Sequence, residues 1–196
     1  MFIELTDHLR CTADHAESYL VLLPGEMDGR QVMSGDLGCP VCARVVKVLD
    51  GVADFGGGRA SGGQTQLSAE AVAAFLGLSG PGGYIALVGG VTSLADELAK
   101  SLPDVGLALV NPPDGTTSNS AAGILRAGRL PIKTSSMRGV VLGADLSRDS
   151  DWVRDAVRAV LPGLRVVAES GEAPQDVLEL LARSPECWVG RKPRTT

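Results

Sequence analysis

The stretch Tyr84-Ile85-Ala86-Leu87-Val88-Gly89-Gly90 decides the fold expected of this chain of 196 residues. Five consecutive apolar residues are typical of a strand that is covered on both faces, because a strand with one solvated face would alternate with polar residues. The two glycines end the run and allow the backbone to turn tightly. The sequence therefore predicts that this run forms a central strand of a parallel sheet.

From residue 67 onward, helical and strand-like patterns alternate on both sides of this run. Helices are expected to begin at Ser68, at Thr92 or Ser93, and at Ser150, whose hydroxyls can cap a helix N-terminus. Two more helices are expected over residues 118–127 and 174–182, and further strands over residues 105–110, 139–142, 164–168 and 187–190. Strands joined by helices imply right-handed crossovers. We therefore predict an α/β domain over residues 67–196, with a mainly parallel sheet and helices on both faces.

Residues 56–66 separate this domain from the first 55 residues. Their sequence, Gly-Gly-Gly-Arg-Ala-Ser-Gly-Gly-Gln-Thr-Gln, has five glycines among eleven residues. Such a composition is typical of a flexible coil rather than a packed element. We therefore predict a flexible linker over residues 56–66, between a small domain over residues 1–55 and the α/β domain.

Three of the four cysteines lie in residues 1–55, and their spacing predicts a metal site. The motif Cys39-Pro40-Val41-Cys42 separates two thiols by two residues, so both sulfurs can face one ion. Zinc in structural sites takes four tetrahedral ligands from cysteine and histidine. We therefore predict one structural zinc ion, bound by Cys11, His15, Cys39 and Cys42.

Alternatives to this ligand set remain open. Asp14 keeps a two-residue spacing from Cys11 and could replace His15, as could His8, although His15 is the better zinc donor. The thiols could instead be unligated or form a redox pair. A redox Cys-x-x-Cys normally stands at a helix start, where the dipole lowers the pKa of the first thiol, whereas this one lies between two strand patterns. The metal site is therefore the favoured interpretation, although Ala43 stands where such turns often have glycine.

The rest of residues 1–55 is predicted to form short strands. Together with the two ligand-bearing turns, these strands make a β zinc ribbon. The run Tyr19-Leu20-Val21-Leu22-Leu23 is apolar at every position, although a ribbon has only one face to bury. Exposing the excess would cost about 1.5–3 kcal/mol for each side chain. We therefore expect residues 67–196 or another chain to cover this strand.

Three segments of the first 55 residues resemble a known family. They are Leu9-Arg10-Cys11, Gly38-Cys39-Pro40-Val41-Cys42 and Lys47-Val48-Leu49-Asp50-Gly51-Val52. They are similar to the small zinc-ribbon proteins that activate tRNA, rRNA and release-factor methyltransferases, although His15 stands where a second cysteine is common. The resemblance implies a structural zinc ion and a ribbon that covers apolar surface on a protein partner. That partner would be a methyltransferase or a second copy of this chain in a homodimer.

The stretch from Gly82 to Gly90 resembles the first strand and glycine turn of Rossmann-like S-adenosylmethionine methyltransferases. The resemblance implies an S-adenosylmethionine site formed by Gly89, Gly90, Asn111 and Asp145, at the carboxyl ends of the strands, although a surface turn is the favoured interpretation for Asp145. The family's acidic residue before the turn is absent, and Asn111 stands where the second strand should end in an acid. The same two absences argue against a dinucleotide site.

The loop Asn111-Pro112-Pro113 is similar to the Asn/Asp-Pro-Pro-aromatic loop of amino-methyltransferases. That loop follows the fourth strand in the family, whereas here it follows the second, and Asp114 replaces the aromatic residue. A rigid turn is therefore the favoured interpretation. No catalytic residue is assigned from the sequence.

The formal net charge of −5 disfavours a protein that binds nucleic acid through phosphate contacts, without excluding it. Arg126, Arg129, Lys133 and Arg138 could form a local basic patch, but a solvated surface is the favoured interpretation. No apolar run is long enough to span a bilayer, so a soluble, cytoplasmic protein is expected.

Two functions fit these observations. The first is a zinc-binding interaction or scaffold protein whose methyltransferase-like domain has lost catalysis. The second is an active S-adenosylmethionine-dependent methyltransferase with a fused activating zinc ribbon. Binding of S-adenosylmethionine separates the two hypotheses.

Overall fold

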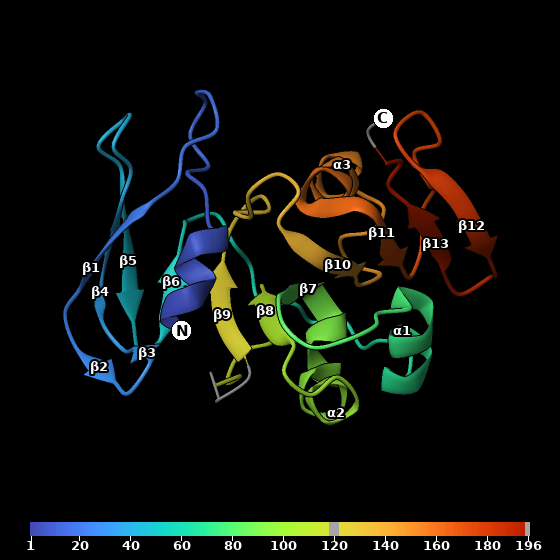
Figure 1. Cartoon of the computed structure of the whole chain (residues 1–196), viewed down its shortest axis with the longest axis horizontal. Coiled ribbons are helices and arrows are strands. Elements are labelled where there is room, and N and C mark those ends of the chain that lie inside the picture. The colour runs from blue at the N-terminus through green and yellow to red at the C-terminus, as the bar shows by residue number, and fades with distance from the viewer. Residues whose placement is uncertain (118–121, 195–196) are drawn as a thin grey trace.

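The computed structural model describes residues 1–117 and 122–194. Among these residues, eleven strands form one sheet in the order β1-β4-β5-β6-β9-β8-β7-β10-β11-β13-β12 (Figure 1). Its parallel part consists of β6 (Val52–Asp54), β9 (Ala122–Arg126), β8 (Gly106–Val110), β7 (Tyr84–Val88), β10 (Met137–Leu142) and β11 (Val160–Ala168). At one edge the pairing is antiparallel, through β13 (Trp188–Arg191) and β12 (Glu179–Arg183).

Strand β7 lies in the middle of the parallel part, between β8 and β10. Ile85, Ala86, Leu87 and Val88 are all fully buried. Ile85 and Leu87 belong to one apolar cluster, and Ala86 and Val88 to another, because successive side chains of a strand point to opposite faces. The prediction of a central strand is confirmed.

Helices cover both faces of this sheet (Figure 1). On one face, α1 (Ala69–Leu76) and α2 (Ala95–Ser101) bury side chains in the first of the two clusters. On the other face, α3 (Ser150–Ala159) buries Trp152 in the second cluster. The predicted α/β fold, with a mainly parallel sheet and helices on both faces, is confirmed.

The helix starts follow capping chemistry, with two shifts from expectation. The Ser68 hydroxyl accepts a hydrogen bond from a backbone amide in the first turn of α1, as predicted. Asp149 rather than Ser150 caps α3, because its carboxylate accepts from two amides of that helix. The 3-10 helix η2 (Gly89–Leu94) precedes α2, so α2 begins later than Thr92. None of the helices among the described residues has the length and apolar character that crossing a membrane requires.

Two predicted helices are wrong. Of the helix expected over residues 118–127, residues 118–121 lie outside the described residues, and residues 122–126 form strand β9. That strand fills the gap between β6 and β8, where Ile124 and Leu125 are buried, so sheet packing outweighs the local helical pattern. The helix expected over residues 174–182 gives way to β12, which pairs with β13.

Residues 1–55 extend the same sheet. The extension consists of the antiparallel strands β1 (Val21–Pro24), β4 (Gly35–Gly38) and β5 (Val45–Leu49). Strand β6 follows β5 through a tight turn and pairs in parallel with β9, with Ala53 opposite Leu125. The remaining elements are the 3-10 helix η1 (Ile3–His8) and a separate hairpin of β2 (Met27–Asp28) and β3 (Gln31–Val32).

We call residues 1–55 the ribbon. Side-chain contacts also join the ribbon to the rest of the molecule. Arg10 Nη2 lies 3.7 Å from the carboxylate of Asp155 on α3. The Glu17 carboxylate accepts hydrogen bonds from the backbone amide and the hydroxyl of Thr134. The ribbon is therefore fixed by contact. Residues 67–196 nevertheless leave part of the apolar strand β1 uncovered, since Leu23 is 65% exposed.

Candidate functional site

The structure brings the four predicted metal ligands together. The ligand atoms of Cys11, His15, Cys39 and Cys42 all lie within 4.8 Å of one another. Cys11 Sγ lies 3.7 Å from Cys42 Sγ. Cys39 Sγ lies 3.5 Å from His15 Nε2. Zn–S bonds of about 2.3 Å and Zn–N bonds of about 2.0–2.1 Å give tetrahedral edges of about 3.8 and 3.6 Å, so these side chains fit one zinc ion.

Hydrogen bonds set the tautomer of His15 and lower the pKa of the Cys39 thiol. His15 Nδ1–H donates to the Ala16 carbonyl at 2.6 Å, which leaves Nε2 free as the ligand atom. The same bond raises the pKa of His15. Burial acts to raise the pKa of the Cys39 thiol, but the backbone N–H groups of Cys42 and Val41 outweigh it and lower that pKa to about 6. A thiolate at Cys39 suits zinc, which binds the deprotonated sulfur.

The surroundings of the four ligands bear on the alternatives left open by the sequence. Asp14 and His8 do not belong to the four-residue group. The ring of His8 instead lies against Tyr84, with the ring centroids 5.0 Å apart. Ala43 has a φ of 59°, a left-handed conformation that favours glycine, which explains why glycine is common at this position of such turns.

The residues predicted to hold S-adenosylmethionine meet at the carboxyl edge of the parallel strands. Gly89 and Gly90 follow β7, Asn111 follows β8, and Asp145 lies in the loop after β10. Gly90 N–H donates to Asp145 Oδ1 at 3.3 Å. A Cβ added to Gly89 would collide with the Asp145 carboxylate, so this position needs glycine. The structure thus brings Asp145 onto the glycine turn itself.

The side chain of Asn111 makes one donated and one accepted hydrogen bond to the backbone of Ala127. Its Nδ2–H donates to the Ala127 carbonyl at 2.8 Å, and its Oδ1 accepts from the Ala127 amide at 2.9 Å. The residue is 3% exposed and has a φ of 54°, which asparagine tolerates better than most residues. An aspartate could accept from the amide but could not donate to the carbonyl. This pairing gives a structural reason for asparagine at the position where the family has an acid.

Residues 56–66, predicted as a flexible linker, lie across this same edge. The Ser61 hydroxyl donates to Asp145 Oδ2 at 2.7 Å, and the Ser61 amide donates to the Asn111 carbonyl at 3.2 Å. A Cβ added to Gly90 would lie 2.8 Å from the Gly63 carbonyl oxygen, so the two backbones touch. Because of this cover, Ser61, Gly90 and Asn111 are buried.

A second carboxylate holds the far end of this segment, which we call the strap (residues 56–66). Glu169, which follows β11 and is 5% exposed, accepts hydrogen bonds from the Thr65 hydroxyl and the Gln66 amide, each at 2.6 Å. Its other oxygen accepts from the Ala144 amide at 3.0 Å. No local pattern in the sequence points to Glu169, because its partners in the strap lie about a hundred positions earlier in the chain.

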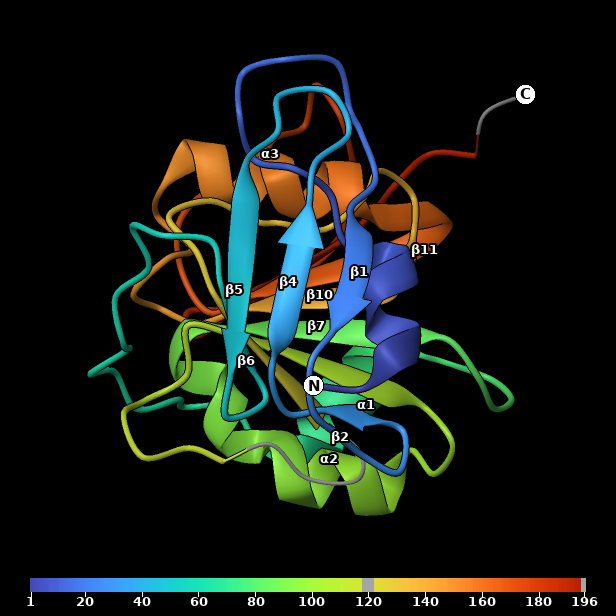
Figure 2. The same cartoon turned by 90° about the vertical axis from the view of Figure 1, so that its left-hand side faces the viewer.

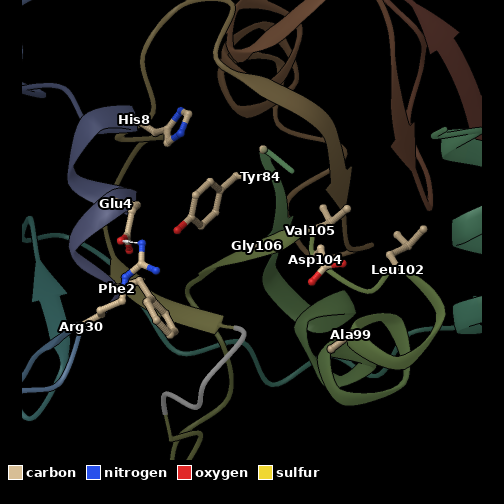
Figure 3. Close-up of a pocket in the computed structure, with 11 residues that line it drawn as sticks. Phe2, Glu4, His8, Arg30, Tyr84, Ala99, Leu102, Asp104, Val105 and Gly106 are labelled. Atoms are coloured by element: carbon tan, nitrogen blue, oxygen red, sulfur yellow. Dashed lines mark hydrogen bonds and ion pairs between the residues drawn. The ribbon is translucent and has the colours of Figure 1, made fainter. Parts of the chain in front are cut away.

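A cavity of about 560 Å³ opens at the opposite, amino edge of the strands (Figure 3). Phe2, His8 and Tyr84 lie on one side of it, and Leu102 and Val105 on the other. Burial lowers the pKa of His8 and raises the pKa of Tyr84. The one sequence signal for this cavity was Tyr84, the single residue with a polar atom in its side chain within the apolar run.

Two basic residues of the predicted patch, Arg126 at the end of β9 and Arg138 in β10, donate hydrogen bonds to acceptors of the chain itself. Arg126 contacts the Pro112 carbonyl and the Asp114 carboxylate. Arg138 donates to carbonyl oxygens of residues 79–82. These two side chains therefore have acceptors within the chain.

The chain matches no protein-family model and no curated protein sequence. Among solved structures, the [4+2]-cyclase SpnF matches with a TM-score of 0.52 and 10% identity, over 70% of this chain and 88% of that one. The antibiotic-resistance methyltransferase Kmr matches with a TM-score of 0.46 and 13% identity, over 70% of this chain and 99% of that one. A SAM-dependent methyltransferase from Aquifex aeolicus matches with a TM-score of 0.45 and 11% identity, over 63% of this chain and 88% of that one.

At these identities the likeness concerns the fold alone. The chain therefore has an α/β fold with a mainly parallel sheet and helices on both faces, and it shares a fold with SpnF.

Proposed function

We propose that this chain is a zinc-binding interaction protein whose methyltransferase-like domain does not catalyse methyl transfer. The observation that carries the proposal is the strap, which closes the carboxyl edge of the sheet from within the chain. In this proposal the domain is a scaffold that holds the ribbon in a fixed position.

The metal centre supplies the zinc-binding part of the proposal. Three thiols and one imidazole match the donor set of structural zinc sites, and their spacing matches a tetrahedron. Four protein ligands leave no coordination position for a substrate. The proposed zinc is therefore structural, and the reducing cytoplasm is the proposed setting, since it keeps the thiols available to the metal.

The carboxyl edge supplies the argument against catalysis. S-adenosylmethionine would need the glycine turn and a polar group at the end of β8. The glycine turn is covered by Gly63 and hydrogen-bonded to Asp145, and the Asn111 side chain is held against the Ala127 backbone. These groups therefore do not fit the cofactor as they stand.

Isothermal titration calorimetry tests this proposal on the full chain loaded with zinc. Titration of zinc into chelator-treated protein first gives the fraction of protein with an intact metal site, which serves as the control for sample quality. S-adenosylmethionine and S-adenosylhomocysteine are then titrated separately. We expect no binding up to millimolar ligand, and micromolar binding of either compound would overturn the non-catalytic proposal.

The second candidate, an active methyltransferase with a fused activating ribbon, is favoured by one observation. The ribbon is docked on the methyltransferase-like domain of the same chain, through β6 and β9 and through Arg10 and Asp155. A ribbon held in this way could support an enzyme as well as a scaffold. The calorimetric titration separates the two, because methyl transfer requires that S-adenosylmethionine binds.

A further inference from the structure

The outward face of the ribbon carries an ordered set of exposed side chains. Antiparallel partners point to the same side of a sheet, so the register places Val21, Gly38 and Val45 in one row. The next row contains Leu23, Asp36 and Lys47, and Leu49 follows on the same side of β5. Figure 2 shows β1, β4 and β5 side by side at the front of the molecule. We call this surface the outer ribbon face.

The outer ribbon face is unusually apolar for a solvated surface. Val21 and Val45 are 45% and 50% exposed, and Leu23 and Leu49 are 65% and 63% exposed. The opposite side of the same strands is already filled, since Leu37 and the alternate residues of β5 are buried in the core. Four large apolar side chains exposed on one face favour an interaction surface.

A single ion pair stands at the centre of this face. Lys47 Nζ lies 2.8 Å from one carboxylate oxygen of Asp36 and 3.1 Å from the other. The two residues are cross-strand neighbours on β4 and β5. A positive and a negative group side by side are self-complementary, because a two-fold rotation about an axis between them, along the strands, exchanges their places.

From this pattern we infer that the outer ribbon face joins two copies of the chain. The two-fold axis runs along β4 and β5, between them. It sets Asp36 of one copy against Lys47 of the other, and Val45 of one copy against Gly38 of the other, where the missing side chain leaves room. A hollow of about 440 Å³, lined in part by Leu23 and Leu49, adds space for side chains of the second copy. The inference rests on the proposed interaction function and names its partner.

Sedimentation velocity of the full, zinc-loaded chain from submicromolar to high micromolar concentration tests this inference. We expect the wild-type mass to rise to twice 20.2 kDa as the concentration increases. D36K and K47D each place like charges opposite one another, so each variant alone should stay monomeric. An equimolar mixture of the two variants should restore the dimer, because positive faces then meet negative faces.

A matched charge pair at the far edge of the sheet supplies the control. Glu179 and Arg191 are also cross-strand neighbours, joined by a 2.7 Å ion pair and similarly exposed. E179K and R191D change the net charge as D36K and K47D do, and both should leave dimerisation unchanged.

Three results would overturn the inference: a wild-type chain that is monomeric throughout, a dimer that survives D36K, or one that E179K also abolishes. A monomer that binds zinc but not S-adenosylmethionine would refute the dimer alone. Micromolar S-adenosylmethionine binding would refute the non-catalytic proposal and leave the sedimentation result standing.

Discussion

The hydroxyl of Ser61 donates a 2.7 Å hydrogen bond to Asp145 Oδ2, and the other oxygen of the same carboxylate accepts from the Gly90 amide. One carboxylate thus ties the strap to the glycine turn. The Ser61 hydroxyl also accepts from the Gly63 amide at 3.2 Å. The Asp145 side chain therefore holds the strap at Ser61 and the glycine turn at Gly90 together.

Removing this link should destabilise the chain. S61A deletes both hydrogen bonds of the hydroxyl and should lower the free energy of unfolding by about 1–2 kcal/mol, measured by urea denaturation. The control is S101A, which removes an exposed hydroxyl at the end of α2 and should cost less than about 0.5 kcal/mol. Equal effects of the two substitutions would show that the strap adds no stability.

Placing an acid at the end of β8 should destabilise the chain. N111D replaces the donor that faces the Ala127 carbonyl with a second acceptor, in a buried position, and should cost about 3 kcal/mol at neutral pH. Burial should raise the pKa of the introduced carboxyl, so the cost should shrink as pH falls below that pKa and the group becomes protonated. A cost that is small or independent of pH would contradict the pairing with Ala127.

Loss of one metal ligand should lower the free energy of unfolding only when zinc is present. Cys42 is exposed, so C42S removes little packing and isolates the contribution of the metal. With zinc, C42S should lower the free energy of unfolding by several kcal/mol, because zinc binding is coupled to folding. After chelation, wild type and C42S should unfold alike. A zinc stoichiometry near zero in the wild type, with freely titrating thiols, would refute the metal site.

Replacing Ala43, which follows the second thiol of the Cys-x-x-Cys motif, with glycine should raise the free energy of unfolding. Ala43 has a φ of 59°, so A43G relieves a left-handed strain of about 1–2 kcal/mol, partly offset by the entropy of glycine in the unfolded chain. A net gain of up to about 1 kcal/mol is expected in the zinc-loaded protein. A73G, inside helix α1, should instead cost about 1 kcal/mol. Destabilisation by A43G would argue against the left-handed turn.

Two leucines near β1 should respond very differently to serine. Leu20 is 6% exposed and packs in the core, so L20S should cost about 2–5 kcal/mol. Leu23 is 65% exposed on the outer ribbon face, so L23S should change the stability of the dilute monomer by less than about 0.5 kcal/mol. Thermal unfolding at low protein concentration measures both. A similar loss in the two variants would mean that β1 is buried on both sides.

The central strand and the cluster of three cysteines and one histidine were predictable because most of their signals are local. Five apolar residues in a row place β7 inside the sheet, and two-residue spacing brings the thiols of Cys39 and Cys42 together. The helix expected over residues 118–127 failed because Ala122 to Arg126 gain their burial from β6 and β8, which lie far away in the sequence.

The strap was misjudged for a related reason. Glycine content describes how freely residues 56–66 move in an unfolded chain. It does not reveal that Ser61 and Thr65 find carboxylates at Asp145 and Glu169. Likewise, the sequence did not show that β6 continues the sheet of the second half of the chain.

The parallel pairing of β6 with β9 also sets an order of events during synthesis. The ribbon strands leave the ribosome well before Ala122–Arg126 are made, and at about 5–20 residues per second this interval is about 4–14 s. Throughout that time the edge of β6 has no neighbour, and β-strand edges without neighbours pair readily with other nascent chains. Zinc capture by the ribbon cannot shorten this interval, because it is β9 that covers that edge of β6. The speed at which residues 55–126 are synthesised therefore sets how long the edge stays open.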